Sequence, residues 1–281
     1  IRRPPRSTQG VSSAASDVYK RQVRNIFKTS LGRKYLMAIS GAGLFGFVIM
    51  HMLGNLTIFV GPAAINQYAA KLHSLGPLLW LARIGLIVMI GIHIWTAIKL
   101  NKENKHARKI KYEGAIKPVD KHRKNEIIAR YAARTMIYSG FIIAAFAFYH
   151  LAHYTWKIPQ INGLNKDFET FYVHEVDSGE NQIAFSTALP DGLGKEGENA
   201  VDVYRMVTTG FGVWWISIFY IISVGLLCIH LSHGLSAMFQ SLGFKTKNSE
   251  KLINRFAFAT GWFLFIGYSS VPISILFKFI K

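Results

Sequence analysis

Five long stretches of the chain carry almost no charge, and the charged residues collect between them. The stretches cover about residues 36–60, 78–100, 131–156, 206–240 and 256–277. A helix of about 20 apolar residues crosses the ~30 Å hydrocarbon core of a bilayer. The pattern therefore predicts an all-α integral membrane protein with five transmembrane helices. The fourth stretch is longer than one crossing needs, so we expect it to tilt or to protrude at one end.

The distribution of charge predicts the orientation of these helices. The 281 residues include 33 Lys or Arg and 15 Asp or Glu, which gives a net charge of +18. The basic residues lie before the first stretch and in segments 101–134 and 245–255, whereas loop 157–205 is acidic. Lys and Arg collect in cytoplasmic loops. We therefore expect a cytoplasmic N-terminus and an external C-terminus, and this clustering beside apolar runs argues against nucleic-acid binding.

The remaining segments predict a single membrane domain over residues 23–281. Residues 1–22 are polar and lack the apolar core of a signal peptide, so we expect a disordered or artefactual leader there. The acidic loop 157–205 is expected to form a cap on the outer face. The single cysteine, Cys228, lies in an apolar stretch, and no C-x-x-C-H motif is present, which excludes covalent c-type haem attachment.

Six of the ten histidines fall within the apolar stretches; they are His51, His93, His150, His153, His230 and His233. An ionisable side chain at membrane depth is costly and indicates a functional site by default. Neutral imidazoles suit haem iron, and two b-type haems need four axial imidazoles. Four separate stretches carry at least one histidine each. The sequence therefore predicts a di-haem four-helix bundle with a fifth helix beside it.

The depth of each histidine predicts how the imidazoles pair. His51 and His150 each lie 15 residues into the uncharged run of an outward-running helix, so both are ~22 Å along it. His93 lies six residues before Lys99, toward the cytoplasmic side, and His230 lies past mid-membrane. We therefore expect His51 and His150 to ligate an outer haem, and His93 and His230 to ligate an inner haem.

Two further histidines leave the choice of ligands open. His153 and His233 lie three residues after His150 and His230, on nearly the same helix faces, so either could substitute. We favour His150 because its depth matches that of His51.

Three segments resemble a known family: SLGRKYLMAISGAGLFGFVIMHMLGN (30–55), LHSLGPLLWLARIGLIVMIGIHIWTAIKL (72–100) and HLSHGLSAMFQSLGF (230–244). They are similar to the cytochrome b membrane anchor of succinate:quinone oxidoreductases (complex II). The similarity is to the five-helix, di-haem cytochrome b558 type of bacterial succinate dehydrogenases and fumarate reductases. It covers about residues 25–281, and the acidic loop matches poorly.

This resemblance implies a function in electron transport. The first and third of the four histidines would hold the distal haem, and the second and fourth the proximal haem. The chain would lie in a bacterial inner membrane and bind a flavoprotein and an iron–sulfur subunit on its cytoplasmic face. Electrons from succinate would pass through both haems to a quinone, which the resemblance implies to be menaquinone, as a step of the tricarboxylic acid cycle. The chain would be the electron-transfer and quinone-reacting subunit, without dicarboxylate chemistry of its own.

Two positions depart from the family pattern. Cys228 stands where some members carry a glutamate used for proton movement, and His73 stands where some carry an acidic quinone-site residue. The candidate quinone-binding residues are His73, as a proton source, and Arg83, as a ligand of a quinone carbonyl or of a haem propionate. The alternative for this pair is an interfacial histidine and a snorkelling arginine. The candidate partners of the inner haem propionates are four basic residues: Arg33, Lys34, Arg130 and Arg134.

Two other functions stay open at this point. A di-haem cytochrome b of a formate dehydrogenase, a hydrogenase or a b561-type reductase would share the haems and differ in its partner. A haem-free transporter would use the histidines as proton relays. The scarcity of carboxylates in the apolar stretches, and the lack of an inverted repeat of broken helices, argue against the transporter.

Overall fold

The computed structural model describes residues 29–107, 124–163, 172–173 and 200–280. For residues 124–134, 172–173 and 200–201 it describes the backbone alone. The expected leader at 1–22 and most of the acidic loop 157–205 lie outside the described residues.

Within these residues, five helices are long and apolar enough to cross a membrane. They are α2 (Ser30–Leu56), α4 (Pro77–His106), α5 (Lys124–His150), α8 (Trp214–Ser241) and α9 (Glu250–Leu276). The helix α2 continues into η1 (Thr57–Phe59), and α5 continues into the π-helical segment η2 (Leu151–Thr155). The shorter elements are α3 (Pro62–Ser74), η3 (Pro159–Ile161), α7 (Val203–Gly212), and strands β1 (Tyr172–Val173) and β2 (Ala200–Val201), which pair antiparallel. The predicted multi-pass helical membrane protein is confirmed.

The fourth apolar stretch is not one helix, contrary to the prediction of a single span over 206–240. The helix α7 ends at Gly212, α8 begins at Trp214, and Val213 between them is extended, with φ −79° and ψ 107°. The Ser217 hydroxyl donates to the carbonyl oxygen of Phe211 at 2.6 Å, across the break. The excess length of this stretch therefore forms a separate short helix rather than a protruding or strongly tilted end.

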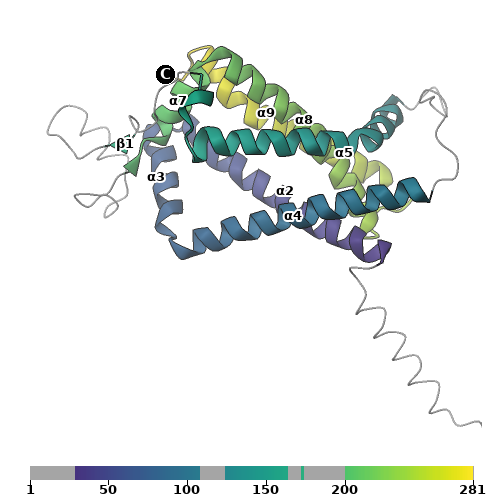
Figure 1. The fold of residues 1–281 in the computed structure, drawn as a ribbon. Coiled ribbons are helices and arrows are strands. Elements are labelled where there is room, and N and C mark those ends of the chain that lie inside the picture. The colour runs from purple at the N-terminus through teal and green to yellow at the C-terminus, as the bar shows by residue number, and fades with distance from the viewer. Residues whose placement is uncertain (1–28, 108–123, 164–171, 174–199, 281) are drawn as a thin grey trace, which may run out of the picture.

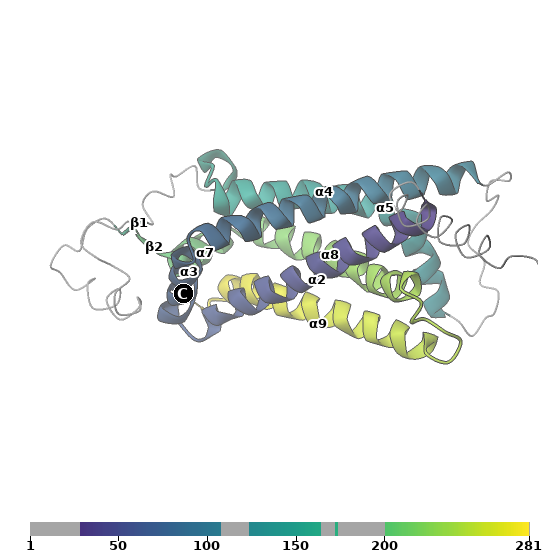
Figure 2. The same cartoon turned by 90° about the horizontal axis from the view of Figure 1, so that it is seen from below.

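The spanning helices lie side by side in one bundle (Figures 1 and 2). The helix α8 packs against α9, α2 and α5, whereas α4 packs mainly against α2. A buried cluster of Met52, Val224, Cys228 and Leu264 joins α2, α8 and α9. All of α4 is described, and its one buried residue is Thr96. Such a helix, with apolar side chains exposed along its length, is suited to contact with lipid.

The helices α3 and α7 cover one end of the molecule, which we call the α3/α7 end. Figure 1 shows α3 lying across the ends of α2 and α4. The buried Asn66 joins α3 to α7: its Nδ2 donates to Asp202 Oδ1 at 3.0 Å, and its Oδ1 accepts the Tyr204 N–H at 3.0 Å. These two hydrogen bonds hold α3 and α7 together at the α3/α7 end of the molecule.

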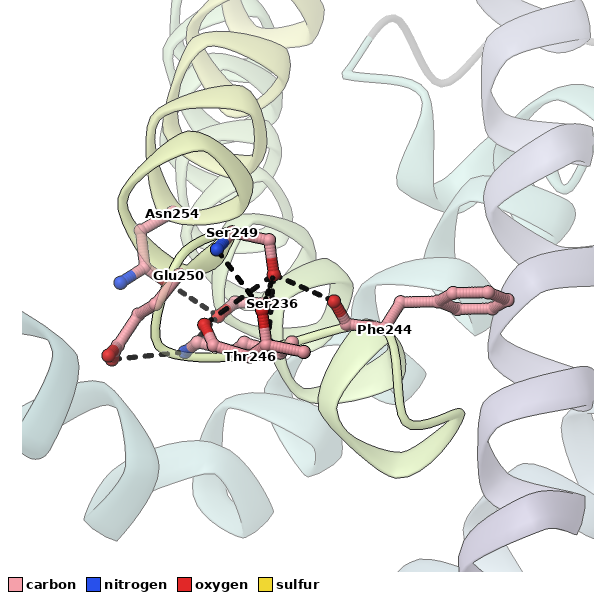
Figure 3. A network of polar contacts seen from close by, with 7 residues as sticks. Ser236, Phe244, Thr246, Ser249, Glu250 and Asn254 are labelled. Atoms are coloured by element: carbon pink, nitrogen blue, oxygen red, sulfur yellow. Dashed lines mark hydrogen bonds and ion pairs between the residues drawn. The ribbon is translucent and has the colours of Figure 1, made fainter.

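A polar network closes the turn between α8 and α9 at the opposite end (Figure 3). The Ser249 hydroxyl donates to the carbonyl oxygen of Phe244 at 2.8 Å and accepts the Thr246 N–H at 2.8 Å. Lys245 Nζ donates to Ser236 Oγ at 3.0 Å. These bonds satisfy backbone groups that the helix ends leave open, so we interpret the network as structural.

Candidate functional site

The first candidate histidine pair lies between α2 and α5. The ring centroids of His51 and His150 are 5.7 Å apart, and the ring planes are 82° to one another. A metal–imidazole nitrogen bond is about 2.0 Å long, so imidazoles on opposite sides of one metal ion have ring centres roughly 6 Å apart. The structure therefore brings this predicted pair to a separation close to that of two axial ligands.

Aromatic side chains from two helices surround His51. Phe47, one turn earlier on α2, stacks on the imidazole at 5.4 Å between ring centroids. Tyr268 of α9 lies at 6.2 Å, and its hydroxyl donates to the carbonyl oxygen of Val48 at 2.6 Å. The fifth spanning helix thus contributes a contact to this pair, although it supplies none of the histidines.

The π-helical segment η2 gives His150 and His153 different surroundings. It starts directly after His150, and the Trp156 N–H donates to the carbonyl oxygen of Leu151 at 2.8 Å, five residues back. His150 faces the α2 imidazole, whereas His153 is fully buried and stacks on Tyr154 at 4.1 Å. The expectation that either histidine could serve assumed a regular α-helix, whereas in the wider π turn the two imidazoles have different neighbours.

Tyr220 of α8 lies between these two histidines. Its hydroxyl is 3.0 Å from His153 Nδ1 and 3.4 Å from His150 Nδ1. A hydroxyl has one hydrogen, so it donates to one imidazole and accepts from the other. Donation along the shorter contact, to His153, leaves the Tyr220 oxygen to accept Nδ1–H of His150. The Nε2 lone pair of His150 is then available to a metal.

The second candidate pair begins with His93, which packs against a Ser-Gly pair on α2. His93 Nδ1 is 3.3 Å from Ser40 Oγ. A Cβ atom added at Gly41 would lie 3.3 Å from His93 Cε1, so the absence of a side chain there allows the imidazole to approach the helix closely.

The same arrangement recurs between α5 and α8. His230 Nδ1 is 3.0 Å from Ser139 Oγ, and a Cβ atom at Gly140 would lie 3.7 Å from His230 Cε1. His93 and His233 both lie near enough to His230 to interact with it electrostatically. The side chains of His93 and His230 therefore also lie near one another, and each contacts a serine of the adjacent helix.

The two pairs lie at two levels along the spanning helices. On α2, Ser40 marks the level of the second pair and His51 that of the first, eleven residues further on. On α5, Ser139 and His150 are also eleven residues apart. At 1.5 Å per residue, both helices place the levels about 16 Å apart.

The candidate quinone residues lie toward the α3/α7 end. His73 lies in the last turn of α3 and is exposed, and the Arg83 guanidinium lies over the Trp80 ring at 5.0 Å from its centroid. Partial burial, and then the positive charges of Arg83 and Lys157, lower the pKa of His73 from its usual 6.5. The three basic side chains therefore form one positively charged cluster, of which Lys157 was not predicted.

The candidate propionate partners lie toward the opposite end of α2 and α5. Arg33 forms an ion pair with Glu103, which joins the start of α2 to the end of α4. Lys34 is exposed. The side chains of Arg130 and Arg134 lie outside the described residues. Arg33 therefore already pairs with the Glu103 carboxylate. A haem propionate would have to share the Arg33 guanidinium with Glu103 or displace Glu103 from it.

Fold and site together define a multi-pass helical membrane protein with histidines paired between its helices. No protein-family model, curated protein or solved structure matches this chain.

Sequence reasoning missed several residues of this site, among them Ser139, Tyr220 and Lys157. The sequence did contain a signal for Ser139. A Ser-Gly pair followed by nine residues and then a histidine occurs twice, at 40–51 and 139–150. No local pattern indicates Tyr220 or Lys157, since each reaches the site from another part of the chain.

Proposed function

We propose that this chain is the di-haem cytochrome b membrane anchor of a succinate:quinone oxidoreductase, passing electrons between an iron–sulfur subunit and a quinone of the menaquinone type. The observation that supports the proposal is the arrangement of the histidines. Four spanning helices supply two imidazole pairs, at levels about 16 Å apart. Across a hydrocarbon core of ~30 Å, two such levels place one pair in each half of the membrane.

The residues at each level fit a haem b. His51 with His150, and His93 with His230, would each hold one haem b through imidazoles from different helices. When bound, the haems would supply one-electron carriers at the two levels. Gly234 lies one turn after His230 on α8, and a Cβ atom there would meet no other atom within 4 Å. The backbone of α8 thus leaves open space beside the imidazole for a flat ring.

The basic surface supports an orientation with the α8–α9 turn in the cytoplasm. The exposed basic residues at that end include Lys34, Lys102, Lys105, Lys247, Lys251 and Arg255. Positive residues favour the cytoplasmic side. We assign this face to the flavoprotein and iron–sulfur subunits, which places His93 and His230 nearer the electron donor. The dicarboxylate chemistry belongs to those partners.

The cluster of His73, Arg83 and Lys157 is the proposed quinone site. Its basic side chains can donate hydrogen bonds to quinone carbonyl oxygens. Because its pKa is lowered, His73 is neutral at pH 7, and it can donate one ring hydrogen while accepting at the other nitrogen.

A spectrum of the purified chain tests the haem proposal. We expect a dithionite-reduced minus oxidised spectrum of b type and a pyridine haemochrome count of two haems per chain. Alanine at His51, His93 or His230 should remove at least one haem. The matched control is His106→Ala, because His106 is an exposed histidine at the end of α4.

The partner then distinguishes complex II from other di-haem cytochromes. Co-purification with subunits that oxidise succinate supports the proposal, whereas co-purification with a formate dehydrogenase or a hydrogenase would replace it. A haem-free chain isolated from membranes that make haem would refute electron transfer and favour a transporter.

A further inference from the structure

The serines beside His93 and His230 already use their hydroxyl hydrogens. The Ser139 hydroxyl donates to the carbonyl oxygen of Met136 at 3.0 Å. The Ser40 hydroxyl donates to the carbonyl oxygen of Leu36 at 2.7 Å. Each serine oxygen therefore faces its imidazole as an acceptor.

An acceptor at Nδ1 determines where each imidazole carries its hydrogen. A neutral imidazole has one ring hydrogen, and a hydrogen bond from Nδ1 to the serine oxygen places it on Nδ1. The Nε2 atom then keeps its lone pair, which is the form that ligates a metal. The same relation holds for both histidines, at 3.3 Å for His93 and 3.0 Å for His230.

We propose that Ser40 and Ser139 are positioning residues, each accepting Nδ1–H of one inner axial histidine and presenting its Nε2 to the haem iron. The inference rests on the haem-binding function proposed above. Hydrogen bonds to the far nitrogen of a metal-bound imidazole fix its tautomer and orientation and raise its basicity. The two serines therefore act on the inner haem and leave the outer haem unaffected.

The glycine after each serine also lies against the imidazole, and at Gly41 the lack of a side chain allows the close approach. A Cβ atom at Gly41 would approach His93 Cε1 to 3.3 Å, which is tighter than an ordinary contact, whereas at Gly140 the distance to His230 Cε1 would be 3.7 Å. Each Ser-Gly pair thus combines a hydrogen-bond acceptor with a close packing surface for the same ring. The double occurrence, on two helix pairs, is why we assign it a role beyond ordinary helix packing.

The expected effect is a change in the potential of one haem. Loss of the acceptor makes the imidazole a weaker donor to ferric iron. Outer-shell changes of this kind alter metal affinity by about 10- to 100-fold. A tenfold loss in the preference for ferric over ferrous iron raises a one-electron midpoint potential by about 59 mV.

Redox titration of the whole chain, followed by optical and low-temperature EPR spectra, tests the inference. Ser40→Ala and Ser139→Ala should each raise the midpoint potential of one haem by about this amount, and the other haem should be unchanged. Ser139→Thr keeps a hydroxyl and should retain the wild-type potential. The control is Ser270→Ala on α9, because the Ser270 hydroxyl also donates to a carbonyl three residues back, at 2.7 Å from Gly267.

The outcomes separate this inference from the function on which it rests. A wild-type chain that binds no haem refutes the proposed function. Two haems in the wild type, with unchanged potentials and spectra in both alanine variants, refute the role of the serines alone. An equal shift in Ser139→Thr or in Ser270→Ala would also overturn it, because the effect would then not depend on the hydroxyl beside the imidazole.

Discussion

Replacing His153 tests which histidine of α5 serves as a ligand. The variant His153→Asn removes the imidazole but keeps a short polar group that can accept from the Tyr220 hydroxyl, now 3.0 Å from His153 Nδ1. We expect this variant to retain two haems, because His150 faces His51 at 5.7 Å while His153 lies among tyrosines. His150→Asn, by contrast, should lose the outer haem and keep the inner one.

The variant His153→Ala tests how much His153 contributes to the stability of the folded protein. His153 is fully buried, so truncation leaves a cavity and removes a hydrogen-bond partner of Tyr220. An unsatisfied buried polar group costs about 1–3 kcal/mol, and the cavity adds to this cost, for roughly 2–4 kcal/mol in total. At about 2–4 °C for each kcal/mol, the thermal midpoint should fall by roughly 4–16 °C. His153→Asn should lie much closer to the wild type.

Haemochrome counts and thermal unfolding in detergent measure both effects on the same preparations. One haem in His153→Asn together with two haems in His150→Asn would refute the reasoning, because His153 would then be the ligand. Equal stability of His153→Ala and the wild type would show that the Tyr220 contact contributes little.

Three further predictions concern packing and the α3/α7 end. Gly261→Ala should destabilise the contact between α8 and α9 by about 1–3 kcal/mol in thermal unfolding, because its Cβ would lie 3.1 Å from a carbonyl oxygen of α8. Gly225→Ala, with an ordinary contact at 3.5 Å, is the control and should change little. Asn66→Ala removes both bonds between α3 and α7 and should make that end more sensitive to limited proteolysis, whereas unchanged cleavage would contradict the connection. Arg83→Gln removes one positive charge and should raise the pKa of His73 toward 6.5, measured by NMR of labelled histidine. Since the folded state disfavours protonated His73, wild-type stability should fall as the pH drops below 6.5, and less so in this variant; an unchanged pKa would contradict the electrostatic contact.

The spanning helices could be predicted because a bilayer imposes a simple condition. Each crossing needs a long apolar run whose backbone groups bond within the helix, and the five runs satisfy it. The break between α7 and α8 had no comparable signal. Val213 lies in a continuous apolar run without charge or proline, and the hydrogen bond across the break comes from a serine within that run. The helix α3 was missed because its segment, residues 62–74, is only partly apolar.

The pairing of the histidines could be predicted in part because the rise of an α-helix is constant. Equal distances along two helices placed His51 and His150 at one depth, and the structure brings their rings together. The choice between His150 and His153 required more than spacing. It depends on a π turn and on a tyrosine that arrives from α8, and neither follows from the local sequence of α5.

The spacing of eleven residues explains how four helices can serve two levels. Eleven residues are about three turns of an α-helix, so Ser40 and His51 lie on the same face of α2, as Ser139 and His150 do on α5. Each of these helices therefore contacts one imidazole of a neighbour at one level and supplies its own imidazole at the other. Inserting a single residue between the two positions would turn one of them by about 100° around the helix axis. Both levels thus depend on the same two helices, whereas α4 and α8 each supply an imidazole at one level. The helix α9 supplies no imidazole but packs against α8 and places Tyr268 beside His51.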